Sequence, residues 1–262
     1  MNGQPNNQPN NQQTSEQKVE HDTAGTRVAI VTGGSRGLGA ALANGLAGDG
    51  WTVVIDGRDV ATLEAAATRI GGTSVGTVIA IAGDVADARH RSELVEAARA
   101  AGSIELLINN ASVLGPSPLH HLGDHPLAAL EEIFDVNVVA PLGLIQLALP
   151  DLRRNHGAVI NVSSDAAVEG YEGWGGYGSS KAALDQVSKV LAAEEPDLRI
   201  YAFDPGDMRT AMHQDAFPGD DISDRPEPET VVPAVRVLLA TSPPSGRYRG
   251  SDLSVETLAV PQ

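Results

Sequence analysis

Three side chains capable of acid–base chemistry stand close together in the second half of the sequence. Tyr177 follows Ser164 by 13 positions, and Lys181 follows Tyr177 by four. Residues four apart in a helix share a face, so the tyrosine and lysine are expected to lie together. A neighbouring ammonium lowers the pKa of a phenol from its ordinary value of about 10. The spacing therefore predicts a tyrosine acid–base group tuned by the lysine, with Ser164 hydrogen bonding to a reacting oxygen.

Each member of this group has a simpler explanation when it is taken alone. A tyrosine often packs at a helix start, and a helical lysine is usually a solvated residue. Ser163 competes with Ser164, because adjacent residues on a strand point to opposite faces. The joint spacing of the three residues, together with the glycine-rich segment described next, favours the catalytic interpretation.

A glycine-rich segment, TGGSRGLG at 32–39, lies between a predicted strand and a predicted helix. Gly33 allows a tight turn, Gly37 lets the backbone approach a pyrophosphate, and Gly39 permits close packing. The unpaired N–H groups of the helix start suit phosphate oxygens. A glycine turn that binds nothing is the alternative, and three residues between the first two of these glycines depart from the G-x-G-x-x-G spacing. The segment predicts a dinucleotide site when it is combined with the motifs below.

Short β-branched runs alternate with longer alanine-rich segments from residue 27 onward, which predicts βαβ units. We expect an α/β fold with a doubly wound parallel sheet, whose ligand site lies at the carboxyl ends of the strands. The predicted strands are 27–32, 51–56, 76–82, 104–109, 157–163 and 198–203. The predicted helices are 37–49, 60–70, 86–102, 127–154 and 176–195.

Composition excludes several classes of function. The 262 residues carry a formal charge of −16, with no basic run to bind nucleic acid, and contain no cysteine for disulfides or thiolate chemistry. Residues 1–25, rich in Asn, Gln and Pro, predict a disordered tail before one domain at 26–262. We expect a cytoplasmic protein without nucleic-acid or membrane partners, because the start is not signal-like and the apolar run 138–150 is too short for a bilayer.

The glycine-rich segment opens a series of motifs in a definite order. The series continues with GDV at 83–85, NNA at 109–111, Asn137 in FDVNVV, NVSS at 161–164, YGSSK at 177–181 and DPGDMRT at 204–210. With its T-G-x-x-x-G-x-G and Y-x-x-x-K patterns, the chain resembles the short-chain dehydrogenase/reductase family throughout the part after the tail. The resemblance implies one Rossmann-type domain of about seven strands that forms homodimers or homotetramers, with helices such as 126–152 and 176–195 in the interface.

The resemblance also assigns roles to individual positions. It places Asn137, Ser164, Tyr177 and Lys181 in a catalytic tetrad, with Asn137 at a helix distortion that helps to hold a water between lysine and solvent. It implies no metal. The positions that match the family's nicotinamide dinucleotide site are Gly33, Ser35, Arg36, Gly37, Leu38, Gly39, Arg58, Asp84, Val85, Asn110, Ala111, Tyr177, Lys181, Pro205, Gly206, Met208 and Thr210.

Two features bear on the choice of nicotinamide cofactor. Asp56 ends the second predicted strand, where an acid can bind a ribose 2′-hydroxyl and exclude a 2′-phosphate, which favours NAD. In the family the discriminating acid more often falls one position later, and Gly57 occupies that position. Arg58 and Arg36 can pair with a 2′-phosphate. We therefore expect NADP(H), with NAD(H) as the alternative.

Three variable segments are expected to shape the substrate pocket: 112–125, 165–176 and the acidic 218–229, which matches the family's mobile lid. In the second segment, Tyr171 and Trp174 are candidates for substrate contact or for simple packing. The first segment offers a histidine-rich group of metal ligands, although its place in a variable loop argues against a metal. The members of that group are His120, His121, Asp124 and His125.

These features together predict an oxidoreductase that acts on carbonyl and secondary alcohol groups of a small organic substrate, specifically an NADPH-dependent ketoreductase. A catalytically silent dinucleotide-binding sensor is the alternative. Sensors of this family usually lack part of the tetrad, which is complete here. An epimerase or dehydratase is disfavoured, because the chain lacks the additional C-terminal substrate domain of the extended relatives.

Overall fold

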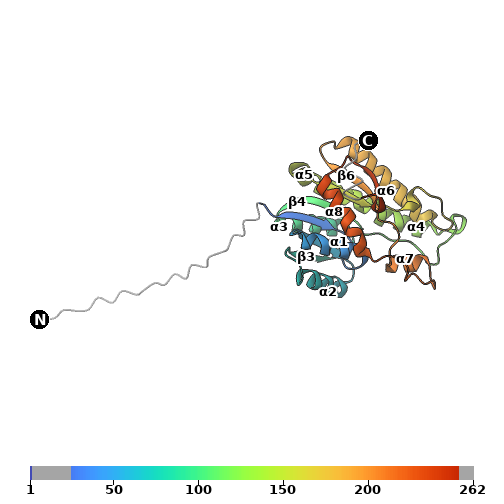
Figure 1. The fold of residues 1–262 in the computed structure, drawn as a ribbon, viewed down its shortest axis with the longest axis horizontal. Helices are drawn as coiled ribbons and strands as arrows, with labels where there is room; N and C mark the ends of the chain where they lie inside the picture. Colours follow the sequence, from blue (N-terminus) through green and yellow to red (C-terminus); the bar gives the residue numbers. More distant parts are fainter. Residues whose placement is uncertain (2–24, 254–262) are drawn as a thin grey trace.

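Seven parallel strands form one sheet in the computed structural model of the chain, which describes residue 1 and residues 25–253 (Figure 1). The strand order is β3-β2-β1-β4-β5-β6-β7. The chain therefore builds the sheet outward from β1 on one side and then from β4 on the other, which is the doubly wound arrangement. This confirms the predicted fold class. The predicted tail, residues 1–25, lies outside the described residues except at its two ends.

The strands are short segments, most of them buried, as is usual in a parallel sheet covered on both faces. They are β1 (Arg27–Val31), β2 (Thr52–Gly57), β3 (Val78–Ala82), β4 (Ser103–Asn109), β5 (Ala158–Val162), β6 (Arg199–Asp204) and β7 (Gly246–Arg249). The six strands predicted from the β-branched runs are all present. The edge strand β7 was not predicted, because its sequence GRYR contains no β-branched residue.

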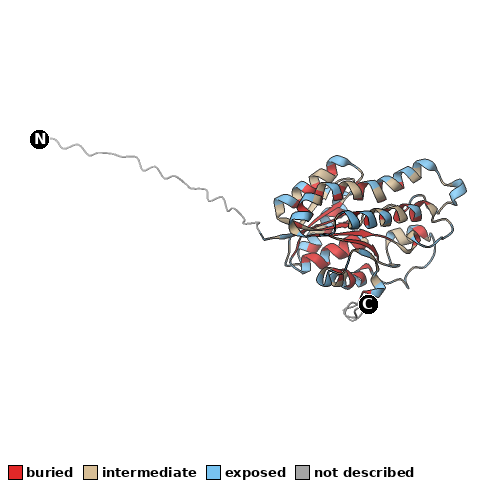
Figure 2. Cartoon of the chain, turned by 90° about the horizontal axis from the view of Figure 1, so that it is seen from above, coloured by how far each residue is buried: buried red, intermediate tan, exposed pale blue. Residues whose placement is uncertain are grey.

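Helices cover both faces of the sheet. One face packs against α1 (Gly37–Gly48), α2 (Val60–Gly71) and α8 (Val232–Thr241). The other packs against α3 (Ala88–Ala101), α5 (Ala140–Asn155) and α6 (Gly175–Glu194). Figure 2 shows the sheet in red between helices whose outer faces are exposed. Two further helices, α4 (Leu127–Phe134) and α7 (Ala211–Ala216), complete the set of α-helices in the described residues.

Alternate residues of a strand contribute to the two cores. In β1, Ala29 and Val31 belong to the core beneath α1 and α8, whereas Val28 and Ile30 belong to the core beneath α3 and α5. All four side chains are fully buried. A shift of one residue would exchange the two faces, so burial fixes the register of the strand and the point where the glycine-rich turn begins.

The predicted helix 127–154 is interrupted by a π-helical segment. The segment, Asp135–Val139, joins α4 to α5 without a break in the helical path and contains Asn137. The combined helix Leu127–Asn155 is thus longer than the apolar run 138–150, and by length and composition alone it could cross a membrane. That is weak evidence, because core helices pass the same test. Residues along α5 pack into the core against β4 and α3, which is the position of a core helix.

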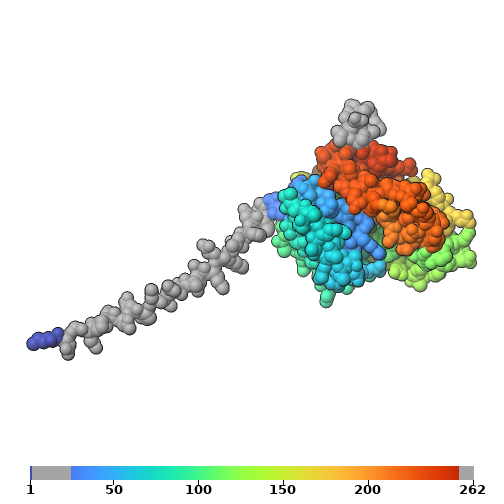
Figure 3. All heavy atoms as spheres, turned by 60° about the horizontal axis from the view of Figure 1, so that its bottom comes forward, coloured from blue at the N-terminus to red at the C-terminus, as the bar shows by residue number. Residues whose placement is uncertain are grey.

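Segments far apart in the sequence meet over α1. The C-terminal third of the chain, orange in Figure 3, lies against the N-terminal part in blue. The short helix η4 (Pro228–Val231) and α8 pack on α1, with Val232 against Gly45. This packing carries the segment after β6 back toward the glycine-rich turn.

Candidate active site

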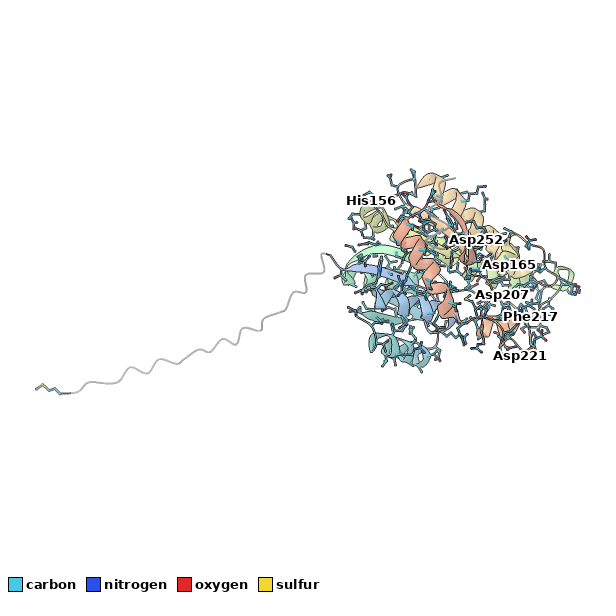
Figure 4. The ribbon with its side chains drawn as sticks, in the orientation of Figure 1. His156, Asp165, Asp207, Phe217, Asp221 and Asp252 are labelled. Atoms are coloured by element: carbon cyan, nitrogen blue, oxygen red, sulfur yellow. The ribbon has the colours of Figure 1, made fainter. Side chains whose placement is uncertain are left out.

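The predicted site residues gather at the carboxyl edge of the sheet. Asp165 and Asp207, which follow β5 and β6, lie on the other side of the molecule from His156, which precedes β5, and Phe217 lies beside them (Figure 4). The neighbouring strands β1 and β4 continue into connections on opposite faces of the sheet. The glycine-rich turn after β1 therefore lies at the topological switch point, where doubly wound folds bind their ligands.

The glycine-rich turn has the geometry predicted from its sequence. Gly33 has a φ angle of +67°, in the left-handed region that favours glycine. A Cβ atom on Gly39 would lie 2.2 Å from the carbonyl oxygen of Gly33, so only glycine lets α1 pack this closely on the turn. Arg36 is the N-cap of α1, and its side chain makes no capping hydrogen bond. The first N–H groups of α1 are thus available to a phosphate.

Gly39→Ala is expected to displace this turn, because the added methyl group meets backbone rather than a flexible side chain. We expect the free energy of unfolding to fall by about 1–3 kcal/mol, and dinucleotide binding to weaken with it. Thermal unfolding and a fluorescence titration with NADPH measure both effects. Gly48→Ala, at the other end of α1, is the matched control, since nothing lies within 4 Å of its added Cβ. Equal stability and affinity in the two variants would contradict the packing argument.

The motif after β4 is tied to the glycine-rich turn. The Thr32 hydroxyl oxygen accepts hydrogen bonds from the backbone N–H groups of Asn110 and Ala111, each over 3.0 Å. The Asn110 amide Nδ2 donates to the carbonyl oxygen of Thr32 over 2.8 Å. Asn110 and Ala111 therefore line the same turn as Gly33.

Asp56 does not face the carboxyl edge as a free carboxylate. Its side chain is buried, with Oδ1 accepting from the Gly33 N–H over 2.6 Å and Oδ2 lying 3.1 Å from Nε2 of His90 on α3. The carboxylate thus supports the glycine-rich turn from beneath. His90, also buried, is a structural contributor that sequence analysis missed, because nothing in the local pattern of α3 marks it.

The neighbouring position, Gly57, packs closely against the glycine-rich turn. A Cβ atom on Gly57 would lie 3.1 Å from the side chain of Ser35, so the end of β2 lies directly beside the glycine-rich turn. Arg36 and Arg58 are both exposed, and neither forms an ion pair with any residue that the structure describes. Arg58 directly follows the position where the family carries its discriminating acid, and Arg36 directly follows Ser35, whose side chain lies against that position.

The other predicted cofactor positions follow β3 and β6. After β3, Oδ1 of Asp84 accepts from the Ala86 N–H over 2.9 Å, and Val85 is buried in the core. After β6, Gly206 has a φ angle of +76°, and the side chain of Thr210 lies 3.6 Å from the position of a Cβ on Gly37. The structure thus brings the segment 205–210 to the start of α1. Leu38 and Met208 contribute to the same core, Leu38 as a buried member.

The catalytic candidates are brought together by β5 and α6. Ser164 follows β5 and is partly exposed, whereas the hydroxyl of its rival Ser163 is buried without a partner among the described residues. Tyr177 and Lys181 share one face of α6, with the lysine Nζ 5.5 Å from the centroid of the tyrosine ring. The same Nζ donates to the carbonyl oxygen of Val162 on β5 over 2.8 Å. The predicted group of serine, tyrosine and lysine is therefore present in space.

The predicted lowering of the tyrosine pKa is wrong for this structure. Burial raises the pKa of Tyr177, and the hydroxyls of Ser112 and Ser164, which oppose that rise, are too weak to reverse it. Burial also lowers the pKa of Lys181 to about 8, against the opposing charge of Asp185. Desolvation exceeds the charge effect because both groups lie inside the molecule. The phenol is therefore protonated near neutral pH, which is the state that can donate a proton.

Asn137 is fully buried in the π-helical segment. Its Oδ1 accepts from the Ser112 hydroxyl over 3.0 Å and from the Val113 N–H over 2.9 Å, while Nδ2 donates to Val113 O and to Ser180 Oγ. The helix distortion implied by the family resemblance is thus present. The side-chain amide itself connects the segment after β4 to α6.

Ser164 already uses its hydroxyl within the chain. The hydroxyl donates to Oδ1 of Asp165 over 3.0 Å and accepts from the Ala166 N–H over 3.2 Å. Tyr171 donates to the other oxygen of Asp165 over 2.9 Å. To donate to a substrate oxygen, as predicted, the Ser164 hydroxyl must turn away from this carboxylate.

Trp174, from the variable segment 165–176, and Phe217, which follows α7, pack in one apolar cluster with Tyr177. The Trp174 ring lies edge-on to the tyrosine, with 5.8 Å between ring centroids, and Phe217 lies 6.0 Å from Trp174. Ala216 and Met212 of α7 join the same apolar cluster. Tyr177 is thus covered by Trp174, α7 and Phe217, and the last of these lies just before the predicted lid 218–229.

A cavity of about 420 Å³ opens beside Asp165, the residue after Ser164. This volume lies within the range of small-molecule sites. Four of its seven lining residues are carboxylic acids, and only one is a cation. The lining residues are Asp165, Glu169, Tyr171, Asp204, Gly206, Asp207 and Arg249.

The histidine-rich group after β4 makes other contacts. His121 lies 3.5 Å from a carboxylate oxygen of Glu172, and the rings of His120 and His125 lie edge to face. Within residues 25–253, no three His, Cys, Asp or Glu side chains converge as a metal site would require.

The fold and this site define a dinucleotide-dependent oxidoreductase. The family model described as short chain dehydrogenase matches residues 27–221. Sepiapterin reductase of Mus musculus is 33% identical over 208 residues, covering 75% of this chain and 80% of its own. An uncharacterised oxidoreductase of Saccharomyces cerevisiae is 34% identical over 187 residues, covering 71% of this chain and 72% of its own.

A solved structure supports the same assignment. A short-chain dehydrogenase of Escherichia coli CFT073 in complex with NADPH superposes with a TM-score of 0.80 at 26% identity, covering 87% of this chain and 98% of its own. The chain belongs to the short-chain dehydrogenase family, and it is an oxidoreductase acting on CH–OH groups.

Proposed function

We propose that the chain is an NADPH-dependent ketoreductase of small organic substrates, with oxidation of the corresponding secondary alcohol as the reverse reaction. The observation that carries the proposal is the meeting of Ser164, which follows β5, with Tyr177 and Lys181 of α6, in a fold that has a glycine-rich turn at the switch point of the sheet. The reductase name of the mouse relative and the NADPH held by the Escherichia coli structure support it.

The chain's own residues supply binding, orientation and a proton. Tyr177, kept protonated by burial, donates its phenolic proton to the carbonyl oxygen of the substrate as that oxygen gains charge. The Ser164 hydroxyl, once turned from Asp165, donates a hydrogen bond to the same oxygen. Lys181 holds its ammonium against the Tyr177 ring and the Val162 carbonyl oxygen. When bound, the nicotinamide supplies hydride to the carbonyl carbon.

The residues present fit a dinucleotide phosphate. Gly33 and Gly39 shape a turn that a Cβ would fill, and the start of α1 is free to bind the pyrophosphate. Both carboxylate oxygens of Asp56 have partners beneath the turn, so Asp56 is not free to bind the ribose 2′-hydroxyl. A 2′-phosphate can then pair with Arg36 and Arg58. We therefore propose NADP(H) in preference to NAD(H), because guanidinium groups bind phosphate through paired charge-assisted hydrogen bonds.

The cavity beside Asp165 indicates which substrates to test first. Its carboxylate-rich lining repels polyanions such as coenzyme A thioesters and accepts neutral or cationic molecules.

We propose a cytoplasmic location for this chemistry. We also propose that the chain forms a homodimer or homotetramer. Val139 of the π-helical segment and Val190 of α6 are exposed apolar side chains, and these two elements pack against each other, so a partner subunit could cover both. Sedimentation velocity tests the oligomeric state.

The test is a panel of carbonyl compounds assayed with the full chain for NADPH oxidation at 340 nm. The panel contains neutral ketones, cationic amino ketones, quinones, sepiapterin and acyl thioesters. We expect turnover of neutral or cationic ketones in preference to the thioesters. Tight NADPH binding with no turnover of any member would contradict the ketoreductase proposal and favour the sensor.

A further inference from the structure

Arg247, on the edge strand β7, contacts three separate segments of the candidate active site. Its Nη2 donates to the carbonyl oxygen of Ser164 over 2.9 Å and to Oδ2 of Asp204 over 3.1 Å. Its Nε donates to Oδ2 of Asp185 over 3.0 Å. A guanidinium has five N–H donors in a fixed plane, so one side chain can satisfy these three acceptors together.

Each acceptor is linked to a group of the proposed site. The carbonyl oxygen of Ser164 belongs to the residue whose hydroxyl faces the Tyr177 phenol. Asp204 uses its other oxygen, Oδ1, to accept from the Gly206 N–H over 3.1 Å, which fixes the turn at the predicted nicotinamide edge. Asp185 lies one helical turn after Lys181 on α6, and its charge acts on the lysine. The Arg247 guanidinium is thus connected to Ser164 directly, to Lys181 through Asp185 and to the Gly206 turn through Asp204.

The setting of these contacts makes them stronger than ordinary surface ion pairs. The side chain of Arg247 is 25% exposed, and those of Asp185 and Asp204 are 16% and 5% exposed. Charge-assisted hydrogen bonds in a partly desolvated setting exceed the small contribution of solvated pairs. The other guanidinium near Asp204, that of Arg249, is half exposed and lies 3.9 Å away. Removal of Arg247 therefore leaves two largely buried carboxylates without their main partner.

We propose that Arg247 is a positioning residue that holds Ser164, the Lys181 turn of α6 and the Asp204–Gly206 turn in one productive arrangement. The proposal rests on the proposed reductase function. Arg247 donates to the backbone of Ser164, not to its hydroxyl, so it sets where the hydroxyl lies without meeting a reacting atom. A misplacement of about 1 Å in such a site can lower the rate by about 10²-fold.

The first experiment compares Arg247→Met with Arg236→Met. Arg236 is the matched control, because its guanidinium also donates to carboxylate oxygens, those of Asp49, and to a backbone carbonyl, that of Gly45, but it does so between α8 and α1. We expect kcat to fall about 10- to 100-fold in Arg247→Met and less than about threefold in Arg236→Met. Thermal unfolding of both variants shows that the chains are folded. Arg247→Lys is expected to recover only part of the rate, because an ammonium lacks the planar fork.

The second experiment separates positioning from general loss of structure. Arg247→Met is made in the parent chain and in a Ser164→Ala chain, as a double-mutant cycle on kcat. If Arg247 acts through Ser164, its removal costs much less when the hydroxyl is already absent. An equal fold-loss in both backgrounds, or a kcat for Arg247→Met within threefold of Arg236→Met, would overturn the proposal.

A third measurement needs no turnover, so it separates this proposal from the proposed function. The fluorescence of bound NADPH reports the surroundings of the nicotinamide, which the Asp204–Gly206 turn is expected to line. We expect the emission maximum and intensity of bound NADPH to change in Arg247→Met and to stay at the parent values in Arg236→Met. Unchanged emission in Arg247→Met would contradict the proposal that Arg247 positions the Asp204–Gly206 turn. This result can be obtained even if the chain reduces no carbonyl in the panel.

Discussion

Tyr177→Phe is expected to bind NADPH almost as tightly as the parent chain and to lose about 10²- to 10⁴-fold in kcat. The substitution removes only the hydroxyl, and the ring still packs against Trp174 and the Lys181 ammonium. Burial raises the pKa of the phenol, so the parent chain holds the proton that reduction of a carbonyl requires. Steady-state kinetics with the best ketone of the panel, and a separate NADPH titration, measure the two quantities.

Tyr201→Phe is the matched control for this loss. Tyr201 is also a buried tyrosine with a raised pKa, and its hydroxyl donates to the carbonyl oxygen of Pro243 over 3.0 Å, away from the candidate site. Its removal is expected to lower stability by about 1 kcal/mol and to leave kcat within a few-fold of the parent. If Tyr177→Phe retained a similar kcat, Tyr177 would not be the proton donor.

The double variant Arg36→Ala/Arg58→Ala is expected to raise the Michaelis constant for NADPH by about 10- to 100-fold and that for NADH only slightly. A hydrogen bond to a charged group contributes about 1.5–3 kcal/mol, and exposure to solvent reduces this. The two guanidinium groups have no ion-pair partners among the described residues, so their removal leaves no carboxylate uncompensated. The ratio of kcat/KM for the two cofactors, measured at fixed ionic strength, reports the effect.

The control for net charge is Arg153→Ala/Arg154→Ala. These arginines lie in the last turn of α5, at the opposite edge of the sheet from the glycine-rich turn. Equal weakening of both cofactors in the Arg36/Arg58 variant, or a parent chain that prefers NADH, would reject the proposed cofactor preference. A similar NADPH defect in the control variant would assign the effect to overall charge.

The strands that could be predicted from the sequence are those that carry a continuous run of apolar residues. Six strands were predicted because parallel strands covered on both faces contain continuous β-branched runs, such as VVI in β2. The seventh, GRYR, contains no β-branched residue and is partly exposed, so it carries no such pattern. The π-helical segment within 127–155 also escapes periodicity, because one inserted residue barely changes an apolar helical pattern.

The candidate site was predicted in position but not in orientation. Sequence spacing placed Ser164, Tyr177 and Lys181 together, because a strand end and one helical turn fix their backbones. It could not show that Asp56 turns beneath the glycine-rich turn, or that Arg247 reaches Ser164, because these contacts join residues distant in the sequence. The direction of the Tyr177 pKa was also wrong, since it depends on burial that the sequence does not display.

The carboxylate beneath the glycine-rich turn has a consequence for redesign of the cofactor preference. Asp56 is bound to the Gly33 N–H and to His90, so it is part of the scaffold on which the turn rests. Exchange of this residue would test the stability of the turn rather than its choice of ligand. We propose that the choice between NADP(H) and NAD(H) rests on the neighbouring surface of Gly57, Arg36 and Arg58. Under this proposal, substitutions at these three positions change the cofactor preference, while the contacts that Asp56 makes beneath the turn stay intact.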